Sequence, residues 1–203
     1  MSIIENNDNQ DTLIFDNIHN YIEVDEIALS IIDTPEFQRL RRIYQGGVLY
    51  YVFPTANHSR FEHSIGTYHL AKKFINNIKY NQPELNITNN IVKVISVAGL
   101  CHDLGHLMYS HLFDDIFLPK LSNYKSLGKM SIHEERSIII LKNIINKYKI
   151  NITPDELVVI GDLINPKNSN YDNWNEQFKI GKWIFQIISN PKNNVDVDKF
   201  DYI

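Results

Sequence analysis

The chain has 203 residues, of which 43% are hydrophobic and 22% are charged, with a formal net charge of −4. That length fits one well-buried core and is short for two domains. The nearly even balance of 20 basic and 24 acidic residues predicts no strong field for nucleic acids, and no apolar run reaches the roughly 18 residues of a membrane span.

The first residues predict a polar tail rather than a targeting signal. Residues 1–11 are rich in Asn and acidic side chains, and they lack a basic start and a hydrophobic core. We therefore expect a disordered tail over 1–11. The single cysteine, Cys101, excludes an intramolecular disulfide and suits a reducing compartment. We expect an intracellular protein without a membrane partner, and Cys101 as a small buried side chain rather than a ligand or nucleophile.

The next forty residues predict a small hairpin and two short helices. Residues 12–15 and 21–24 flank a polar turn, which is typical of a β-hairpin. Residues 27–32 predict a short helix, and the polar cap Thr34 followed by Pro35 predicts the start of a second helix. Three arginines follow on this second helix, and their spacing alone favours a solvated face. They are Arg39, Arg41 and Arg42.

The remaining elements are predicted helices separated by polar loops. Residues 48–54 are expected to form an extended apolar connector. The helices have apolar stripes at helical spacing. They run from about residue 60 to 80, from Thr88 through the apolar run that ends at Leu100, from Ser131 past Ile145, from Thr153 to Ile164, and from Trp183 to Ile188. The pattern predicts a mainly α fold with a small N-terminal hairpin, in one domain over residues 12–203.

The stretch from Leu100 to His111 concentrates the candidate chemistry. An apolar helical run ends there in His102, Asp103 and His106. Histidines four residues apart on a helix share one face, and imidazole nitrogens beside a carboxylate suit a borderline divalent cation. A simpler interpretation is a helix end that carries polar residues, because helix termini favour them.

A zinc protease is another alternative for this stretch. The protease motif His-Glu-x-x-His has the same histidine spacing, but it requires a glutamate after the first histidine as general base. That position holds the shorter Asp103, and Gly105 precedes the second histidine. These two residues argue against a protease.

Several motifs lie along the chain, and across them a histidine is followed by a His-Asp pair and then by a distant aspartate. The motifs are Ile32-Asp33-Thr34-Pro35-Glu36-Phe37-Gln38-Arg39-Leu40-Arg41, Tyr50-Tyr51-Val52-Phe53-Pro54, Arg60-Phe61-Glu62-His63-Ser64-Ile65-Gly66, Ala98-Gly99-Leu100-Cys101-His102-Asp103-Leu104-Gly105-His106, Ser110-His111-Leu112-Phe113-Asp114 and Asp196-Val197-Asp198-Lys199-Phe200-Asp201-Tyr202. This pattern resembles the HD-domain metal phosphohydrolases, and above all their dNTP triphosphohydrolase branch, in which a sterile-alpha-motif domain can precede the HD domain.

The resemblance implies a helical HD core that holds a divalent metal ion, Fe, Mn, Zn or Mg, through two imidazoles and two carboxylates. The implied metal ligands are His63, His102, Asp103 and Asp198. The residues that it implies around the phosphates are His106, His111, Asp114 and His133. Among them, His111 would be the acid for the leaving oxygen, with Asp114 available to orient it.

The resemblance also implies part of a substrate site. It assigns the α-phosphate to Arg60, a base or sugar contact to Gln45, a phosphate contact to Lys199 and deoxyribose packing to Tyr202. In the larger members the catalytic domain continues further, so we expect a shortened HD domain here. Only part of their guanine-nucleotide activator site matches, and a homo-oligomer is left open.

We therefore expect a metal-dependent hydrolase that splits a dNTP into a deoxynucleoside and triphosphate, with a nucleotide rather than a nucleic acid as its main partner. A phosphohydrolase of smaller nucleotides is one alternative. The other is an inactive or weakly active HD protein that binds a nucleotide or a partner subunit.

Overall fold

A two-stranded antiparallel hairpin begins the part of the chain that the computed structural model describes, residues 12–202. Strand β1 (Thr12–Asp16) pairs with β2 (Asn20–Val24), as the sequence predicted. The Asp16 carboxylate closes the turn, because its Oδ1 accepts the backbone N–H groups of residues 18 and 19, both at 2.8 Å. The expected tail at 1–11 lies outside the described residues.

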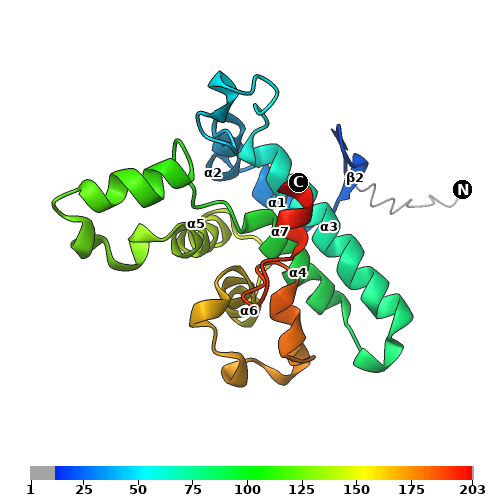
Figure 1. Ribbon diagram of the computed structural model, residues 1–203. Helices are drawn as coiled ribbons and strands as arrows, with labels where there is room; N and C mark the ends of the chain where they lie inside the picture. The colour runs from blue at the N-terminus through cyan, green and yellow to red at the C-terminus, as the bar shows by residue number, and fades with distance from the viewer. Residues whose placement is uncertain (1–11, 203) are drawn as a thin grey trace, which may run out of the picture.

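Helices make up most of the chain after the hairpin, which confirms the predicted mainly α fold (Figure 1). The α-helices of the described chain are α1 (Glu26–Ile32), α2 (Pro35–Gln38), α3 (Arg60–Asn81), α4 (Asn89–Cys101), α5 (His133–Tyr148), α6 (Pro154–Ile164) and α7 (Val197–Tyr202). Short 3₁₀ turns are η1 (Arg39–Arg42), η2 (Leu49–Tyr51), η3 (Pro83–Leu85), η5 (Leu118–Lys120), η6 (Tyr124–Ser131), η7 (Pro166–Asn168), η8 (Tyr171–Asn173), η9 (Glu176–Phe178) and η10 (Lys182–Gln186), and η4 (Leu112–Phe117) is a π-helical segment. Over residues 12–202, none of the helices combines the length and apolar character that crossing a bilayer requires.

Local hydrogen bonds explain where the main helices begin. Ser59 and Thr153 each form a capping box, in which the hydroxyl accepts a backbone N–H and a glutamate three residues on accepts the cap's own N–H. Thr34 and Thr88 cap α2 and α4 through their hydroxyls. The helix starts predicted at Thr34, Thr88 and Thr153 are thus confirmed.

Helix α4 lies at the centre of the fold and is buried on nearly every side. Residues 94–101 are all buried, as expected for a helix that is apolar all round. It packs between α3 and α6, while α7 packs on α3 and crosses the front of the molecule in Figure 1. Cys101, fully buried at the end of α4, is the small core residue that was expected, and burial raises the pKa of its thiol. The central helix therefore ends inside the molecule, where it delivers His102.

Two predicted connections are wrong in detail. Residues 48–54 are not extended but form η2 and adjoining turns with exposed side chains. No strand pairs with this segment in the described chain, so i-to-i+3 bonds such as Tyr51 N–H to Val48 O satisfy its backbone locally. The helix predicted over 183–188 is the short turn η10 (Lys182–Gln186).

The predicted solvated arginine face is also wrong for one of its three members, Arg39. The Arg39 guanidinium is half-buried and donates hydrogen bonds to the backbone carbonyls of Leu104 and His106, the latter at 2.8 Å. Arg41 lies over the Phe61 ring at 3.5 Å from its centroid. Tertiary partners that spacing does not reveal hold Arg39, whereas Arg41 and Arg42 are exposed, as the spacing predicted.

Candidate active site

Three helices bring two histidines and an aspartate to one point. His63 lies in the first turns of α3, His102 directly follows α4, and Asp198 lies in α7. The Nε2 atom of His63 is 3.3 Å from Nε2 of His102 and 2.9 Å from Oδ1 of Asp198. The Nε2 atom of His102 is 3.4 Å from the same oxygen. Among the described residues these three converge closely enough to hold a metal ion.

Asp103 completes what we call the His-Asp group, made of His63, His102, Asp103 and Asp198. Its Oδ2 lies 3.6 Å from Nε2 of His63, and its Oδ1 lies 3.5 Å from Nε2 of His102. Oδ2 also accepts a hydrogen bond from the buried Arg60 guanidinium. The fold thus gathers the four residues named as metal ligands, while their coordination stays a prediction.

Both histidines of this group are held from behind. His102 Nδ1 lies 2.8 Å from the backbone carbonyl of Gly99 and donates to it. His63 Nδ1 lies 2.7 Å from Oδ2 of Asp201, a residue that the sequence reasoning missed. The Asp198-x-x-Asp201 spacing was the available signal, since residues three apart share a helix face. With Nδ1 engaged, each Nε2 presents its lone pair toward the others.

Charge in the His-Asp group favours a bound cation. Burial lowers the pKa of His63 and His102, but the carboxylates outweigh it and raise both, that of His102 to about 10. Burial also opposes ionisation of Asp103 and Asp198, yet the neighbouring histidines, and Arg60 for Asp103, hold both carboxyl pKa values below the ordinary range. Two nitrogens beside two ionised carboxylates fit a divalent transition metal, which binds in competition with protons.

The loop after α4 separates His102 from His106. Helix α4 ends at Cys101, so the expectation that His102 and His106 share one helix face is wrong. The loop is held by arginines, since Arg136 donates to the Gly105 carbonyl at 2.8 Å and Arg39 to its neighbours. A Cβ atom on Gly105 would lie 2.1 Å from the His133 carbonyl, so glycine lets α5 approach. The geometry of a His-Glu-x-x-His protease is not formed.

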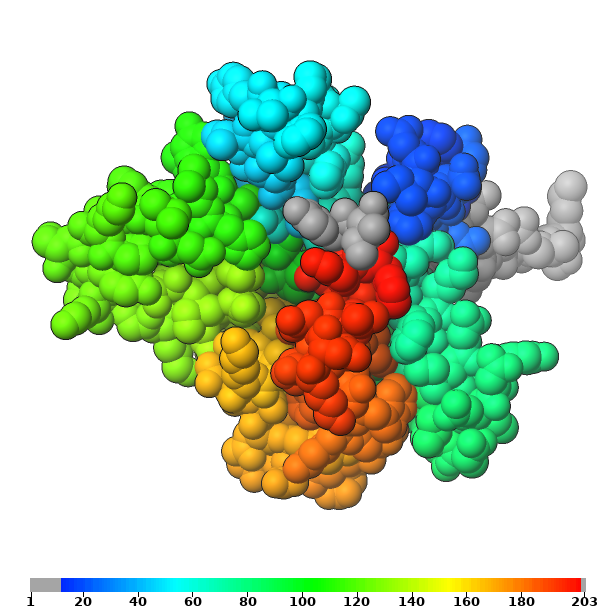
Figure 2. Space-filling model, in the orientation of Figure 1, coloured from blue at the N-terminus to red at the C-terminus, as the bar shows by residue number. Residues whose placement is uncertain are grey.

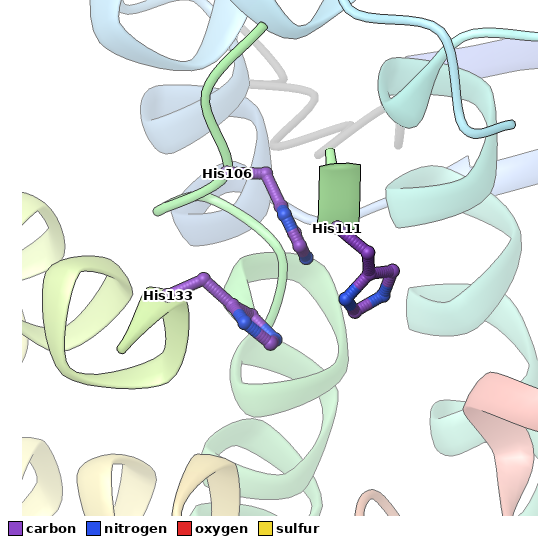
Figure 3. Close-up of side chains that lie close together, drawn as sticks. All are labelled: His106, His111 and His133. Atoms are coloured by element: carbon purple, nitrogen blue, oxygen red, sulfur yellow. The ribbon is translucent and has the colours of Figure 1, made fainter. Parts of the chain in front are cut away.

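A second cluster, the three-histidine group, consists of His106, His111 and His133. Its rings come from the loop after α4, the residue before η4 and the first turn of α5, and they face a common space (Figure 3). His106 and His133 stack with centroids 3.9 Å apart, and His111 lies edge-on at 5.0 and 5.5 Å. These nitrogens are near enough for a metal. Stacked rings, however, hold their in-plane lone pairs parallel rather than convergent, so the His-Asp group is the better metal site.

The ring nitrogens of His106, in the three-histidine group, make only long contacts, because Nε2 lies 3.3 Å from Oδ1 of Asp103 and Nδ1 lies 3.6 Å from Oδ2 of Asp114. His106 is fully buried, and neither of its ring nitrogens makes a hydrogen bond in the described structure. Burial lowers the pKa of His106, and burial with the neighbouring His106 lowers that of His133 to about 2. Both rings are therefore neutral near pH 7, and they offer N–H donors rather than positive charge.

Asp114 does not orient His111, contrary to expectation. Its Oδ2 lies 3.6 Å from Nδ1 of His106 and 3.7 Å from Nδ1 of His133, while Arg136 binds its Oδ1 at 2.5 Å. The carboxylate next to His111 is that of Asp115, at 3.8 Å. The π-helical turn at 112–117 changes the side-chain spacing, so Asp114 faces the interior while His111 faces the open cavity.

Strained backbone sets the position of His111. The two residues before it, Tyr109 and Ser110, have φ values of 63° and 53°, which non-glycine residues seldom adopt. The Ser110 hydroxyl accepts from Arg60 Nε at 2.9 Å and donates to the Tyr44 carbonyl at 3.0 Å. These bonds stabilise the turn and leave the His111 side chain 64% exposed at the site.

One cavity of about 340 Å³ joins the two groups. Figure 2 shows the surface recessed between the red C-terminal helix, the cyan segment and the lime-green segment. The lining residues named from the sequence are Gln45, Arg60, His102, Asp103, His111, His133, Asp198 and Lys199, and those that were missed are Glu134, Ile164, Ile188 and Ser189. The side chain of Tyr202 lies outside what the structure describes. His63, His106 and Asp114 are buried and do not line the cavity themselves.

Comparison with known proteins points to one family. The HD domain model matches residues 60–182. Over 94% of its length the chain is 43% identical to the deoxynucleoside triphosphate triphosphohydrolase SAMHD1 homolog of Dictyostelium discoideum, and 37% identical to the deoxynucleoside triphosphate triphosphohydrolase SAMHD1 of Homo sapiens. It is 40% identical over 92% of its length to the HD domain-containing protein L394 of Acanthamoeba polyphaga mimivirus. The chain spans 35%, 32% and 40% of these relatives, respectively.

Proposed function

Since a matching family model covers more than half of it, this chain belongs to the HD-domain family, and on that premise we propose that it is a metal-dependent phosphohydrolase of deoxynucleoside triphosphates. The single observation that carries the proposal is the shared cavity, which is lined by members of both the His-Asp group and the three-histidine group. Relatives named as triphosphohydrolases support the substrate class.

We assign the metal to His63, His102, Asp103 and Asp198. The donor chemistry supports a divalent metal ion, and Fe, Mn, Zn and Mg are the candidates. When bound there, a divalent cation polarises phosphoryl oxygens and makes water a better nucleophile near neutral pH. Cleavage of a dNTP into deoxynucleoside and triphosphate breaks the bond between the α-phosphorus and the 5′-oxygen, and the oxygen of water enters the triphosphate.

The remaining cavity residues would bind phosphate and complete the proton balance. His106 and His133 are neutral, and the ring nitrogens of His106 make no hydrogen bond within residues 12–202, so both rings suit N–H donation to phosphoryl oxygens. Arg60 and Lys199 bring positive charge to the cavity. We assign protonation of the departing 5′-oxygen to His111, whose exposed ring reaches the cavity. Gln45, whose Oε1 is buried without a partner, would contact the base or sugar, and Tyr202 is assigned to the sugar by likeness alone.

Product analysis tests the proposal directly. The purified chain, loaded with Mn²⁺, is incubated with each dNTP in ¹⁸O-labelled water, and the products are separated by ion exchange. The expected products are a deoxynucleoside and triphosphate that carries one ¹⁸O. Orthophosphate or pyrophosphate as the product would contradict the assignment of the cleaved bond.

The cavity volume favours a second candidate, a phosphohydrolase of smaller nucleotides. About 340 Å³ lies at the low end of ligand pockets, which suits a deoxynucleoside monophosphate. Under the same conditions this candidate predicts orthophosphate from a dNMP and no triphosphate from a dNTP. Nucleotide binding with no turnover of either substrate would instead identify a binding protein.

A further inference from the structure

His63 is held on both sides of its ring, and the proposed function uses only one of them. Nε2 faces the His-Asp group, while Nδ1 lies 2.7 Å from Oδ2 of Asp201 on α7. The other oxygen of Asp201, Oδ1, lies 2.7 Å from Nε2 of His19 in the hairpin turn. The three side chains are 1%, 7% and 13% exposed, so this line of contacts runs through the interior.

The backbone of α3 makes room for this arrangement. Gly66 follows His63 by three residues, on the face that α7 covers. A Cβ atom on Gly66 would lie 1.9 Å from Oδ1 of Asp201, so any side chain there would displace the carboxylate. Asp198 and Asp201 lie three apart on α7 and therefore face the same way. One short helix thus places a carboxylate on each side of the His63 ring.

On the premise of the metal centre in the proposed function, we propose that Asp201 is a positioning residue of that centre and that His19 anchors it. A carboxylate that accepts the Nδ1–H of His63 fixes the ring orientation and leaves the Nε2 lone pair for a cation. Donation from His19 Nε2 to the second oxygen stops the carboxylate from rotating. The hairpin turn thereby becomes part of the metal centre without touching the ion.

Metal affinity of the whole chain tests the role of Asp201. The protein is stripped of metal and titrated with Zn²⁺, and separately with Mn²⁺, against a chromophoric chelator. Asp201→Ala should weaken binding about 10- to 100-fold, the usual effect of losing an outer partner. The control Asp172→Ala removes a carboxylate that is 85% exposed and should leave the affinity unchanged.

The possible results are distinct. Unchanged affinity in Asp201→Ala would overturn the positioning role, whereas a wild-type chain that binds neither ion would overturn the proposed function instead. Should the alanine variant not fold, Asp201→Asn replaces it, because the amide keeps the size but accepts a weaker bond from Nδ1–H. A loss of about tenfold is then expected, and wild-type affinity would overturn the proposal.

The anchor has its own matched pair. His19→Ala should weaken metal binding, while His19→Gln should restore most of it, because the glutamine Nε2–H can replace the imidazole donor. His58→Ala, at an exposed histidine, serves as the control. Wild-type affinity in His19→Ala, or an equal loss in both His19 variants, would overturn the anchoring role.

Two further measurements report on geometry rather than on affinity alone. In the Zn²⁺-loaded, ¹⁵N-histidine-labelled protein, His63 should carry its proton on Nδ1, and a proton on Nε2 would overturn the proposal. Gly66→Ala should reduce metal affinity. Gly161→Ala, in which the new Cβ would lie 3.5 Å from Ile138, should not. Equal affinities for the two variants would show that the position of the Asp201 carboxylate does not matter for metal binding, which would overturn the proposal.

Discussion

The two clusters around the cavity contain similar residues in opposite states. In the His-Asp group each histidine has its outer nitrogen hydrogen-bonded, His63 to Asp201 and His102 to Gly99. In the three-histidine group, neither nitrogen of the buried His106 makes a hydrogen bond within residues 12–202, and the same holds for Oδ2 of the neighbouring Asp114. The histidines of the His-Asp group are therefore held in one orientation, whereas the three-histidine group retains donors and acceptors that are not hydrogen-bonded.

This difference separates two tasks that imidazoles perform. A metal ligand needs a fixed tautomer and orientation, which outer partners provide. A ring that binds phosphate needs its polar atoms available, and burying them unpaired costs about 1–3 kcal/mol each until a ligand arrives. The His-Asp group is therefore arranged for its metal before the metal binds, whereas the hydrogen bonds of the three-histidine group are completed only when a ligand binds.

Removing one histidine from each cluster gives the largest expected difference, which is a difference in metal content. His102→Ala should reduce the metal content from about one ion per chain to near zero. His133→Ala should keep the ion, because the stacked rings do not direct lone pairs to one point. Elemental analysis after gel filtration measures both. Equal metal in the two variants would abolish the distinction between the clusters.

The second prediction concerns catalysis. His111→Ala should reduce single-turnover hydrolysis by about 10²- to 10⁴-fold, the typical contribution of a positioned acid. Because the side chain is 64% exposed, the melting temperature and the metal content should stay at wild-type values. An unchanged rate would remove His111 from the mechanism, and loss of metal would mean that the two clusters depend on each other.

A matched pair of leucine substitutions compares the two states in the metal-free protein. His63→Leu removes one of the two partners of both carboxylates, which leaves Asp198 only His102 and Asp201 only His19, and it should destabilise the fold by about 3 kcal/mol. His106→Leu removes unpaired buried nitrogens and should change the free energy of unfolding by about 1 kcal/mol or less, in the stabilising direction. Urea denaturation measures both. Similar losses in both variants would show that the unpaired atoms carry no cost.

The smallest expected effect is the loss of stability when Asp25, a carboxylate outside both clusters with its hydrogen bonds formed, is replaced. Asp25 caps α1 and accepts from Tyr68, so Asp25→Ala should cost about 1 kcal/mol at pH 7, while Asp25→Asn keeps the cap and costs less. Burial raises the pKa of Asp25, but its hydrogen bonds and Lys72 hold it below the ordinary 3.8. The stabilisation is therefore present above pH 3.8 and is lost as the pH falls through the lowered pKa. If Asp25→Ala still lowered the free energy of unfolding at a pH below the lowered pKa, the ionised carboxylate would not be the source of the stabilisation.

The sequence predicted the parts of the molecule that depend on local signals. The capped helix starts and the buried α4 follow from polar caps and apolar periodicity. The loop after Cys101, the inward turn of Asp114 and the role of Arg39 were missed, because each depends on a partner far along the chain. His102 and Asp103 were candidates from the sequence itself, whereas His63 and Asp198 were named only through family resemblance, since spacing alone does not bring residue 198 to residue 63.

The contact between His19 and Asp201 spans 182 residues, and that between His63 and Asp198 spans 135. Closures of this length form late in folding, because the entropy of ordering the intervening chain must first be overcome. Helix α7 has six residues and is not stable in isolation, so it forms only after α3 and the hairpin are in place to pack against it. A cation that binds only this last arrangement would trap it by mass action. Metal supply would then govern how much newly made chain reaches the native state.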